Sequence, residues 1–230
     1  GVVGNGWAAG QINNLLDKLH ATISVTVSNI TVPSGGVEDE EDDAYRERVL
    51  LAPESFSIGG TVGAYKYFAR QFSPVICDVE TSNDKDANGN DIGGTVVVSV
   101  LTKDGLPGTE LLTQLEKSFQ SERMRILCDK PSARAPQVIN YALNAELTLY
   151  TGANELETIA AAKAAWTDYE AKRRLKLGGD IVPLDIQTVL KVDGVYNVTL
   201  KNLNLTVLSR TQWARCTSVT ITAAEVQQDG

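Results

Sequence analysis

Histidine is almost absent from this sequence: His20 is the only one among 230 residues. A two-histidine zinc site and a histidine facial triad are therefore excluded. His20 could serve a single catalytic dyad, but a lone histidine in a polar, helix-like segment is more often simply solvated. The sequence also lacks a GxSxG elbow and a phosphate-binding loop, and no acidic pair stands in contrasting environments. We therefore expect no enzyme and no catalytic residue, metal ligand or cofactor.

Long apolar runs are missing as well. No stretch approaches the roughly 20 apolar residues that a membrane-spanning helix needs, so we expect no membrane insertion. The first ten residues lack the basic region and apolar core of a secretion signal. The chain does not begin with methionine, and its only methionine is Met124. We therefore expect that this start is processed or trimmed and that an N-terminal part is missing.

Cysteines are few and widely separated: Cys77, Cys128 and Cys216 form no CxxC spacing. An odd, scattered set argues against a disulfide framework and for a reducing compartment, where we expect these residues to be small buried hydrophobes. The apolar fraction of 43% and the charged fraction of 22% are ordinary for globular proteins. A net charge of -8 disfavours contact with nucleic acid phosphates, so we expect no nucleic acid partner.

Apolar periodicity and turn residues predict the elements of the first half. Gly59 and Gly60 precede a helix that Thr61 can cap, and its apolar residues recur every three or four positions. Residues Gly1–Gly10 read as a glycine-rich loop. The first half is predicted to hold strands at residues 23–27, 75–79 and 95–101, and helices at about 38–48, 61–71 and from 109 onward.

The second half contains the clearest strand pattern. Every second residue from Ile139 to Leu149 is apolar, which predicts a strand with one buried face. Asn154 and Glu157 then form a capping-box-like start to a long helix that Gly178 and Gly179 end. The apolar stripe of this helix is expected at Leu156, Ile159, Ala162, Trp166 and Tyr169. A short helix after Pro183 and strands at 195–200 and 219–221 complete the prediction.

These elements predict an α+β fold: two α/β-mixed units of amphipathic helices packed on small, mainly antiparallel sheets. We expect residues 1–36 to form a glycine-rich N-terminal linker and a short strand. Residues 37–130 are predicted to form the first α+β domain and residues 131–230 the second.

The polar loop at Asp84–Asp91 resembles half of a calcium site. Asp84, Asp86 and Asn88 alternate and Gly89 follows, as in the first half of an EF-hand loop. The twelfth position is Thr95, where a bidentate glutamate belongs. A polar hairpin loop is therefore the favoured interpretation, and a calcium-dependent surface-binding module is kept as an alternative function.

An unbroken acidic run follows the turn at Pro33–Gly36. Residues 38–43 are all acidic, and Arg46 and Arg48 come shortly after, an order that favours a helix through its dipole. Such a run is usually a solvated face. As a docking surface it would meet a basic patch on a partner and fix register more than affinity. The first candidates for partner contact are Glu38, Asp39, Glu41 and Asp42.

The stretch SNITVPSGGVEDEEDDAYRERVLLAPESFSIGGTVGAYKYFARQFSPVICDV resembles the baseplate J-like family of contractile phage tails. The family pattern couples a GNG-containing loop to an SGG-acidic-DDAYRER helix, a Gly-Thr-x-x-x-Tyr helix and a short strand. Further matches extend the resemblance, in order, over nearly the whole chain. The matching positions are Gly4–Gly6, Ser34–Gly36, Asp42–Arg48, Gly60–Thr61 with Tyr65, Leu106–Pro107, Ala135–Pro136, Leu149–Tyr150 and Asp193–Val195.

This resemblance implies a structural wedge subunit in the baseplate of a phage, a tailocin or a related contractile injection system, assembled in the bacterial host cytoplasm. It implies self-association and contacts with a smaller wedge partner, other wedge proteins, the hub and spike, and sheath-initiator proteins. Such a subunit would connect hub, sheath and fibres and transmit triggering. Members usually carry an additional N-terminal segment, which this chain is then expected to lack. A carboxylate-based cell-wall hydrolase is the least favoured alternative.

Overall fold

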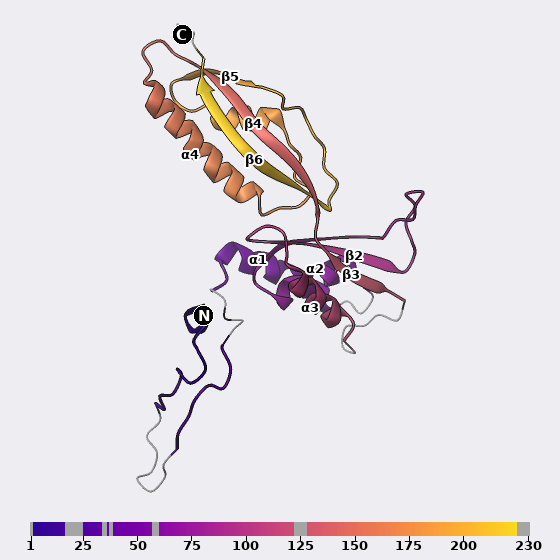
Figure 1. Ribbon diagram of the computed structural model, residues 1–230. Coiled ribbons are helices and arrows are strands. Elements are labelled where there is room, and N and C mark those ends of the chain that lie inside the picture. The colour runs from indigo at the N-terminus through magenta and orange to yellow at the C-terminus, as the bar shows by residue number, and fades with distance from the viewer. Residues whose placement is uncertain are drawn as a thin grey trace. The chain divides into compact units, whose positions relative to one another are not determined.

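A computed structural model describes residues 2–16, 25–33, 36, 39–56, 60–121 and 128–224 (Figure 1). The chain divides into two compact units, residues 1–47 and residues 48–230. Helix α1 (Asp42–Leu51) spans the division, and a 3-10 helix, η2 (Ala52–Phe56), follows it. The two sheets both lie in the second unit.

The first unit consists mainly of two extended limbs after a short 3-10 helix, η1 (Val2–Gly4). Asn29 joins the limbs: its backbone N–H donates to Ile12 (3.1 Å), and its carbonyl accepts from Gly10 (2.8 Å). The strand predicted at residues 23–27 is wrong for residues 25–27, which form no strand, and the rest of it lies outside the described residues. Gly10 has a φ of +83°, which interrupts the extended backbone that a regular ladder would need.

The first sheet has the order β1-β2-β3, with β1 at Ile76–Ser82, β2 at Thr95–Thr102 and β3 at Lys130–Arg134. Helices α2 (Val62–Phe72) and α3 (Thr109–Phe119) pack against it. The Thr61 hydroxyl accepts from the Ala64 N–H (3.2 Å), which confirms the predicted cap of α2. The core of this half is formed by Tyr65, Ala69, Ile76, Val79, Val98, Val100, Leu115, Phe119 and Ala133.

Strand β3 was not predicted, because its sequence contains Pro131. Proline cannot donate to a ladder and is tolerated on edge strands. β3 is such an edge, parallel to β2, with Pro131 opposite Val96. The change from the first sheet to the second therefore falls at Ala135–Pro136, between β3 and β4.

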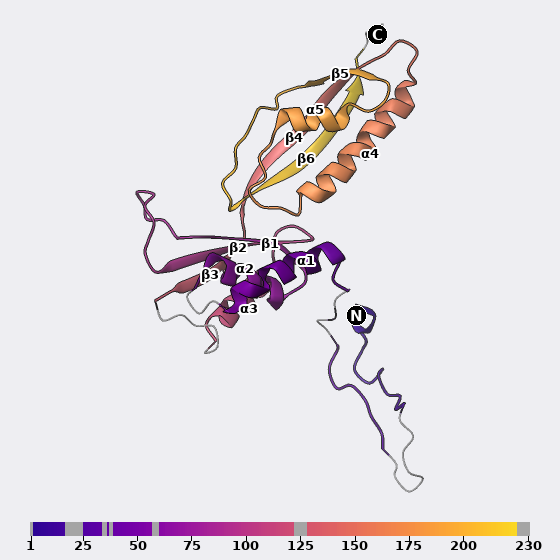
Figure 2. The ribbon, with the colours of Figure 1, turned by 180° about the vertical axis from the view of Figure 1, so that it is seen from behind.

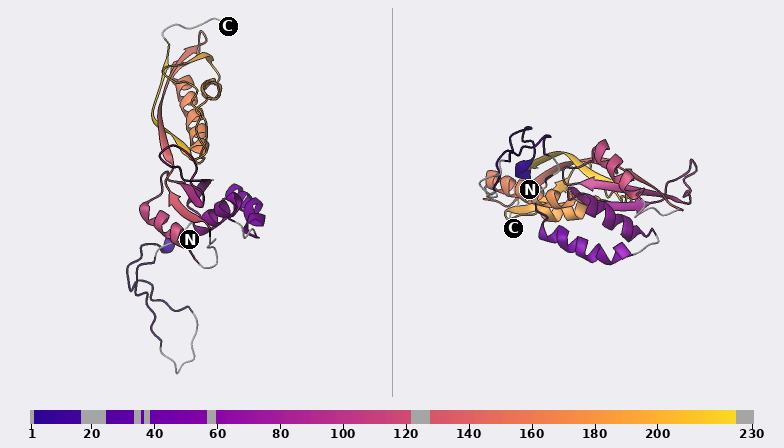
Figure 3. Two further views of the ribbon diagram at one scale, coloured as in Figure 1. Left: turned by 90° about the vertical axis from the view of Figure 1, so that its right-hand side faces the viewer. Right: turned by 90° about the horizontal axis from the view of Figure 1, so that it is seen from below.

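The second sheet has the order β5-β4-β6, with β4 at Gln137–Leu149, β5 at Val195–Leu200 and β6 at Gln212–Ala223. Helices α4 (Glu155–Arg173) and α5 (Pro183–Leu190) cover one face of it (Figures 2 and 3). Alternate residues of β4 from Tyr141 to Leu149 are buried, which confirms the predicted strand. The fully buried side chains of this core include Leu143, Leu147, Ala162, Ile186 and Leu190.

The predicted stripe of α4 is correct at Ala162 and Trp166 but wrong at Leu156, which is 82% exposed. The buried position in the first turns is Thr158 instead. Two residues apart on an α-helix means about 200° of rotation, so Leu156 points away from the side that Thr158 buries. The predicted N-cap is confirmed, since the Asn154 side chain accepts from the Glu157 N–H.

The α+β class is confirmed, but each sheet is mixed rather than mainly antiparallel. β1–β2 and β4–β5 pair antiparallel, whereas β2–β3 and β4–β6 pair parallel. Both parallel pairs are joined by connections that contain helices, as a parallel crossover requires. The predicted strand at residues 219–221 is only the end of the much longer β6. The domain boundaries after residues 36 and 130 stay a prediction.

Candidate functional site

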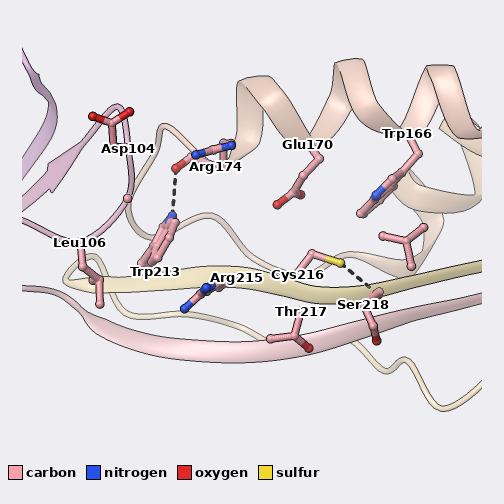
Figure 4. A pocket seen from close by; sticks show the side chains of 12 residues that line it. Asp104, Leu106, Trp166, Glu170, Arg174, Trp213, Arg215, Cys216, Thr217 and Ser218 are labelled. Atoms are coloured by element: carbon pink, nitrogen blue, oxygen red, sulfur yellow. Dashed lines mark hydrogen bonds between the residues drawn. The ribbon is translucent and has the colours of Figure 1, made fainter.

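A cleft of about 540 Å³ lies between α4 and β6 (Figure 4). It is lined by Trp166 and Glu170 of α4 and by Arg174 at the C-cap of this helix, which follow one another at intervals of four residues and share one helix face. We call it the α4–β6 cleft. Its other lining residues come from β6 and from the turn after β2: Trp213, Arg215–Val219 and Asp104–Leu106.

A β-bulge shapes the wall that β6 gives to the cleft. Tyr141 of β4 pairs with Cys216, and the next residue, Ala142, pairs with Ser218, so Thr217 is the extra residue. The Thr217 hydroxyl donates to the Tyr141 carbonyl (3.1 Å). Because the bulge shifts the alternation by one, Cys216 and Val219 both lie on the helical side of the sheet, opposite buried residues of β4.

Glu170 is the most perturbed carboxylate of the cleft. The Tyr141 hydroxyl donates to its Oε2 (3.2 Å). Burial raises the pKa of Glu170 above its ordinary value, although the hydrogen bond from Tyr141 and the charges of Arg173 and Arg174 oppose the shift. Burial also raises the pKa of the Cys216 thiol, which keeps it protonated and a poor nucleophile. The cleft therefore holds a carboxyl group that is hydrogen-bonded to Tyr141, and its cysteine is not activated as a nucleophile.

Two contacts join the two sheets, and the first of them is made by residues that line the cleft. The Trp213 indole N–H donates to the Arg174 carbonyl (2.9 Å), and its ring lies over Gly105, where an added Cβ would come within 3.3 Å of it. The Asp78 carboxylate accepts the Leu177 N–H (2.8 Å) and pairs with Arg70 (3.2 Å). These contacts connect β6 and the segment after α4 with the turn after β2 and with β1.

The acidic candidates for partner contact lie elsewhere, in an exposed segment. Asp39, Glu41 and Asp42 are exposed, while Glu38 lies outside the described residues. The predicted helix from residue 38 is wrong at its start, because the first helical hydrogen bond runs from the Tyr45 N–H to the Glu41 carbonyl and α1 begins at Asp42. α1 buries none of its residues.

The Asp84–Asp91 loop is a polar hairpin between β1 and β2, held by its own side chains and by Arg134 of β3. Both carboxylate oxygens of Asp84 accept from the Arg134 guanidinium (3.1 and 2.5 Å), which holds the pKa of Asp84 below its usual range. Asp86 accepts the backbone amides of residues 88 and 90 (2.9 and 2.8 Å), and Lys85 pairs with Asp91 (2.8 Å). In the described part of the chain, no three His, Cys, Asp or Glu side chains gather closely enough to hold a metal ion.

Other expectations have mixed outcomes. All three cysteines are free, but none is buried: Cys77 and Cys216 are partly buried and Cys128 is exposed. None of the helices in the described ranges is long and apolar enough to cross a membrane. The α4–β6 cleft was not predicted from the sequence, although the spacing of Trp166, Glu170 and Arg174 on a predicted helix was a usable signal.

Comparisons with known proteins all find similarity to baseplate proteins. The family model of the Baseplate J-like protein C-terminal domain matches residues 141–222. Baseplate protein J of Escherichia phage P2 is 30% identical over 216 residues, which cover 91% of this chain and 69% of that protein. A chain in the cryo-EM structure of the anti-feeding prophage (AFP) baseplate, 6-fold symmetrised, has a similar fold, with a TM-score of 0.51 and 14% identity. That match covers 90% of this chain, which spans about half (48%) of the baseplate chain.

Proposed function

Because this chain belongs to the baseplate J-like protein family, we propose that it is a structural wedge subunit in the baseplate of a contractile tail. One observation carries the proposal: the likeness to Baseplate protein J of Escherichia phage P2 extends over 91% of the chain at 30% identity. The chain is thus a baseplate protein of a phage or phage-like particle. The wedge position, the partners and the role in triggering are the parts that we propose.

In this proposal the chain associates with itself and with a smaller wedge partner, and contacts hub, spike and sheath-initiator proteins. It connects hub, sheath and fibres and transmits triggering between them. It assembles in the bacterial host cytoplasm and acts without catalysis. The protonated Cys216 of the cleft supports a structural role, because a protonated thiol is a poor nucleophile.

Helix α1 supports the assembly role. It is only ten residues long and buries none of them, and helices shorter than about 12–15 residues are marginal in water without tertiary packing. Leu50 is 78% exposed, and Phe56 in the following η2 is 84% exposed. We infer that a partner covers α1 and η2 in the particle and that its basic groups meet the acidic candidates Glu38, Asp39, Glu41 and Asp42.

The experiment is deletion of the gene in cells that produce the particle, followed by complementation and electron microscopy of the particles. Deletion is expected to abolish complete baseplates, and the wild-type gene is expected to restore them. Intact particles from the deletion strain would contradict the proposed function.

The acidic contact is tested in the same strain with a variant in which four carboxylates become amides. We expect a lower yield of baseplates, because the electrostatic match to the partner is lost. A control variant neutralises four exposed carboxylates elsewhere and should complement fully. The test positions are Glu38, Asp39, Glu41 and Asp42, and the control positions are Glu110, Asp168, Asp185 and Asp193.

A further inference from the structure

The two sheets have four edge strands, and three of them carry features that discourage pairing with a further strand. β1 carries the charged residues Asp78 and Glu80. β3 is short and contains Pro131. On β5, the Gln187 side-chain amide donates to the Val198 carbonyl (3.0 Å) and occupies a backbone acceptor. These three edges are poor templates for an added strand.

β6 is the fourth edge, and its one such feature between Ser218 and Ala223 is weak: the Cys216 thiol donates to the Ser218 carbonyl (3.4 Å). It pairs with β4 alone among the described strands. From Ser218 to Ala223 it has neither a charged residue nor proline, and its Val, Thr and Ile residues favour strands. Residues 217–220 are exposed one after another. β6 therefore presents a regular row of backbone donors and acceptors to a further strand.

Helix α4 runs beside this edge and has two unlike ends (Figures 1 and 2). Its first turn carries Glu155 and Glu157 around the exposed Leu156, whereas its last turn is basic and leads to Arg174 in the cleft. Leu156 and Arg174 are 18 residues apart, which is five helical turns, so they share one face of α4. The apolar, acidic end of α4 and the cleft at its other end thus lie along one line; the cleft is lined by Arg174 and Arg215 and also by Glu170 and Asp104.

The direction of α4 fixes where these ends lie relative to β6. A short turn joins β4 to α4, so α4 runs back along the sheet, antiparallel to β4 and to its parallel neighbour β6. The Leu156 end of α4 therefore lies toward the C-terminal end of β6. The cleft lies toward the N-terminal half of β6, where Trp213 and Cys216 line it.

We propose that β6 pairs antiparallel with β6 of a second copy of this chain, about a two-fold axis near Thr220. A half-turn places the Leu156 end of each α4 beside the α4–β6 cleft of the other copy. The acidic first turn of one helix then meets Arg174 of the other, and Leu156 gains the apolar wall formed by Trp166 and Val219, which is 44% exposed here. The two three-stranded sheets become one continuous sheet.

This arrangement is self-complementary, as a two-fold interface requires, because each feature finds its counterpart on the same surface of the other copy. It accounts for two side chains that folding of one chain leaves exposed, Leu156 and Val219. The inference rests on the proposed function in one respect: it names the surface for the self-association of a baseplate subunit.

Sedimentation of the full chain over a concentration series tests the pairing. The wild type is expected to dimerise, and Thr220→Lys is expected to raise the dimer Kd at least tenfold, because two lysines then face each other at the axis. Leu156→Glu changes a residue outside the strand and is also expected to raise the dimer Kd. Thr199→Lys, on the exposed side of β5 in the same sheet, is the matched control and should dimerise like the wild type. A monomeric wild type, or a Thr220→Lys variant that dimerises normally, overturns the inference.

Disulfide cross-linking tests which residues of the two β6 strands lie opposite each other. Directly opposite residues of an antiparallel pair have Cα atoms about 4.5–5.5 Å apart, within reach of a disulfide. Thr220→Cys is expected to give a covalent dimer on mild oxidation, and Thr199→Cys no more than the wild type gives. A chain that enters baseplates but shows neither dimer nor cross-link overturns only the β6 pairing. A chain that dimerises through β6 but never enters a baseplate overturns only the baseplate role.

Discussion

Replacing Asp78 with alanine should loosen the contact between the two sheets. The Asp78 carboxylate accepts the backbone N–H of Leu177, just beyond α4, and pairs with Arg70 of α2. Its side chain is 18% exposed, so solvent screens these interactions only partly. Asp78 therefore ties β1 to the segment between α4 and α5.

The expected cost follows from the interactions that are lost, which also include the hydrogen bond from the Val79 N–H to the Asp78 carboxylate (2.9 Å). A hydrogen bond to a charged group contributes about 1.5–3 kcal/mol, and a backbone donor left unsatisfied costs about 1–3 kcal/mol. Because water reaches part of this site, we expect Asp78→Ala to lower the free energy of unfolding by about 2–4 kcal/mol. Asp78→Asn keeps an acceptor for the Leu177 N–H and should cost about 1–2 kcal/mol.

Urea unfolding followed by tryptophan fluorescence measures this loss, because the buried Trp213 reports on the same junction. A loss of this size moves the urea midpoint by roughly 1–2 M. Asp91→Ala is the matched control: it breaks an exposed ion pair with Lys85 and should leave the midpoint unchanged. An Asp78→Ala midpoint equal to that of the wild type would refute the role assigned to Asp78.

Three further predictions concern single residues. Burial raises the pKa of Glu170, so the folded state holds this proton to higher pH than the unfolded state does. The wild type should therefore lose stability relative to Glu170→Gln as pH rises from about 4.5 through the raised pKa, and urea midpoints between pH 4 and 8 check this. Thiol labelling at pH 8 should modify the exposed Cys128 first, because burial raises the pKa of Cys77 to about 11; equal rates in mass spectra would contradict this. Gly194→Ala should destabilise the fold by about 1–3 kcal/mol in thermal unfolding, because φ is +85° and the new Cβ would come within 2.9 Å of the Thr158 hydroxyl.

The elements that local patterns determine were predictable from the sequence. The alternation in β4, the Thr61 cap of α2 and the Asn154 cap of α4 each depend on residues within a few positions of one another. The side chains that satisfy these patterns are the same ones that the fold buries or bonds. Local chemistry and final structure agree at these sites, which is why the α+β class could be predicted.

Features that depend on distant partners could not be predicted. β3 contains Pro131 and becomes a strand only because β2 offers a parallel edge. The early part of β6 contains Arg215 and shows no clean alternation, because the bulge at Thr217 shifts it by one residue. The α4–β6 cleft follows from this bulge, the register with β4 and the position of α4, none of which the sequence specifies locally.

Cryo-electron microscopy of purified particles, with mass spectrometry of the same sample, tests the central claim most directly. We expect that the chain is present and that its two sheets, with α2, α3, α4 and α5, fit density in the baseplate in several copies around the tail axis. Particles with complete baseplates that contain none of this chain would contradict it.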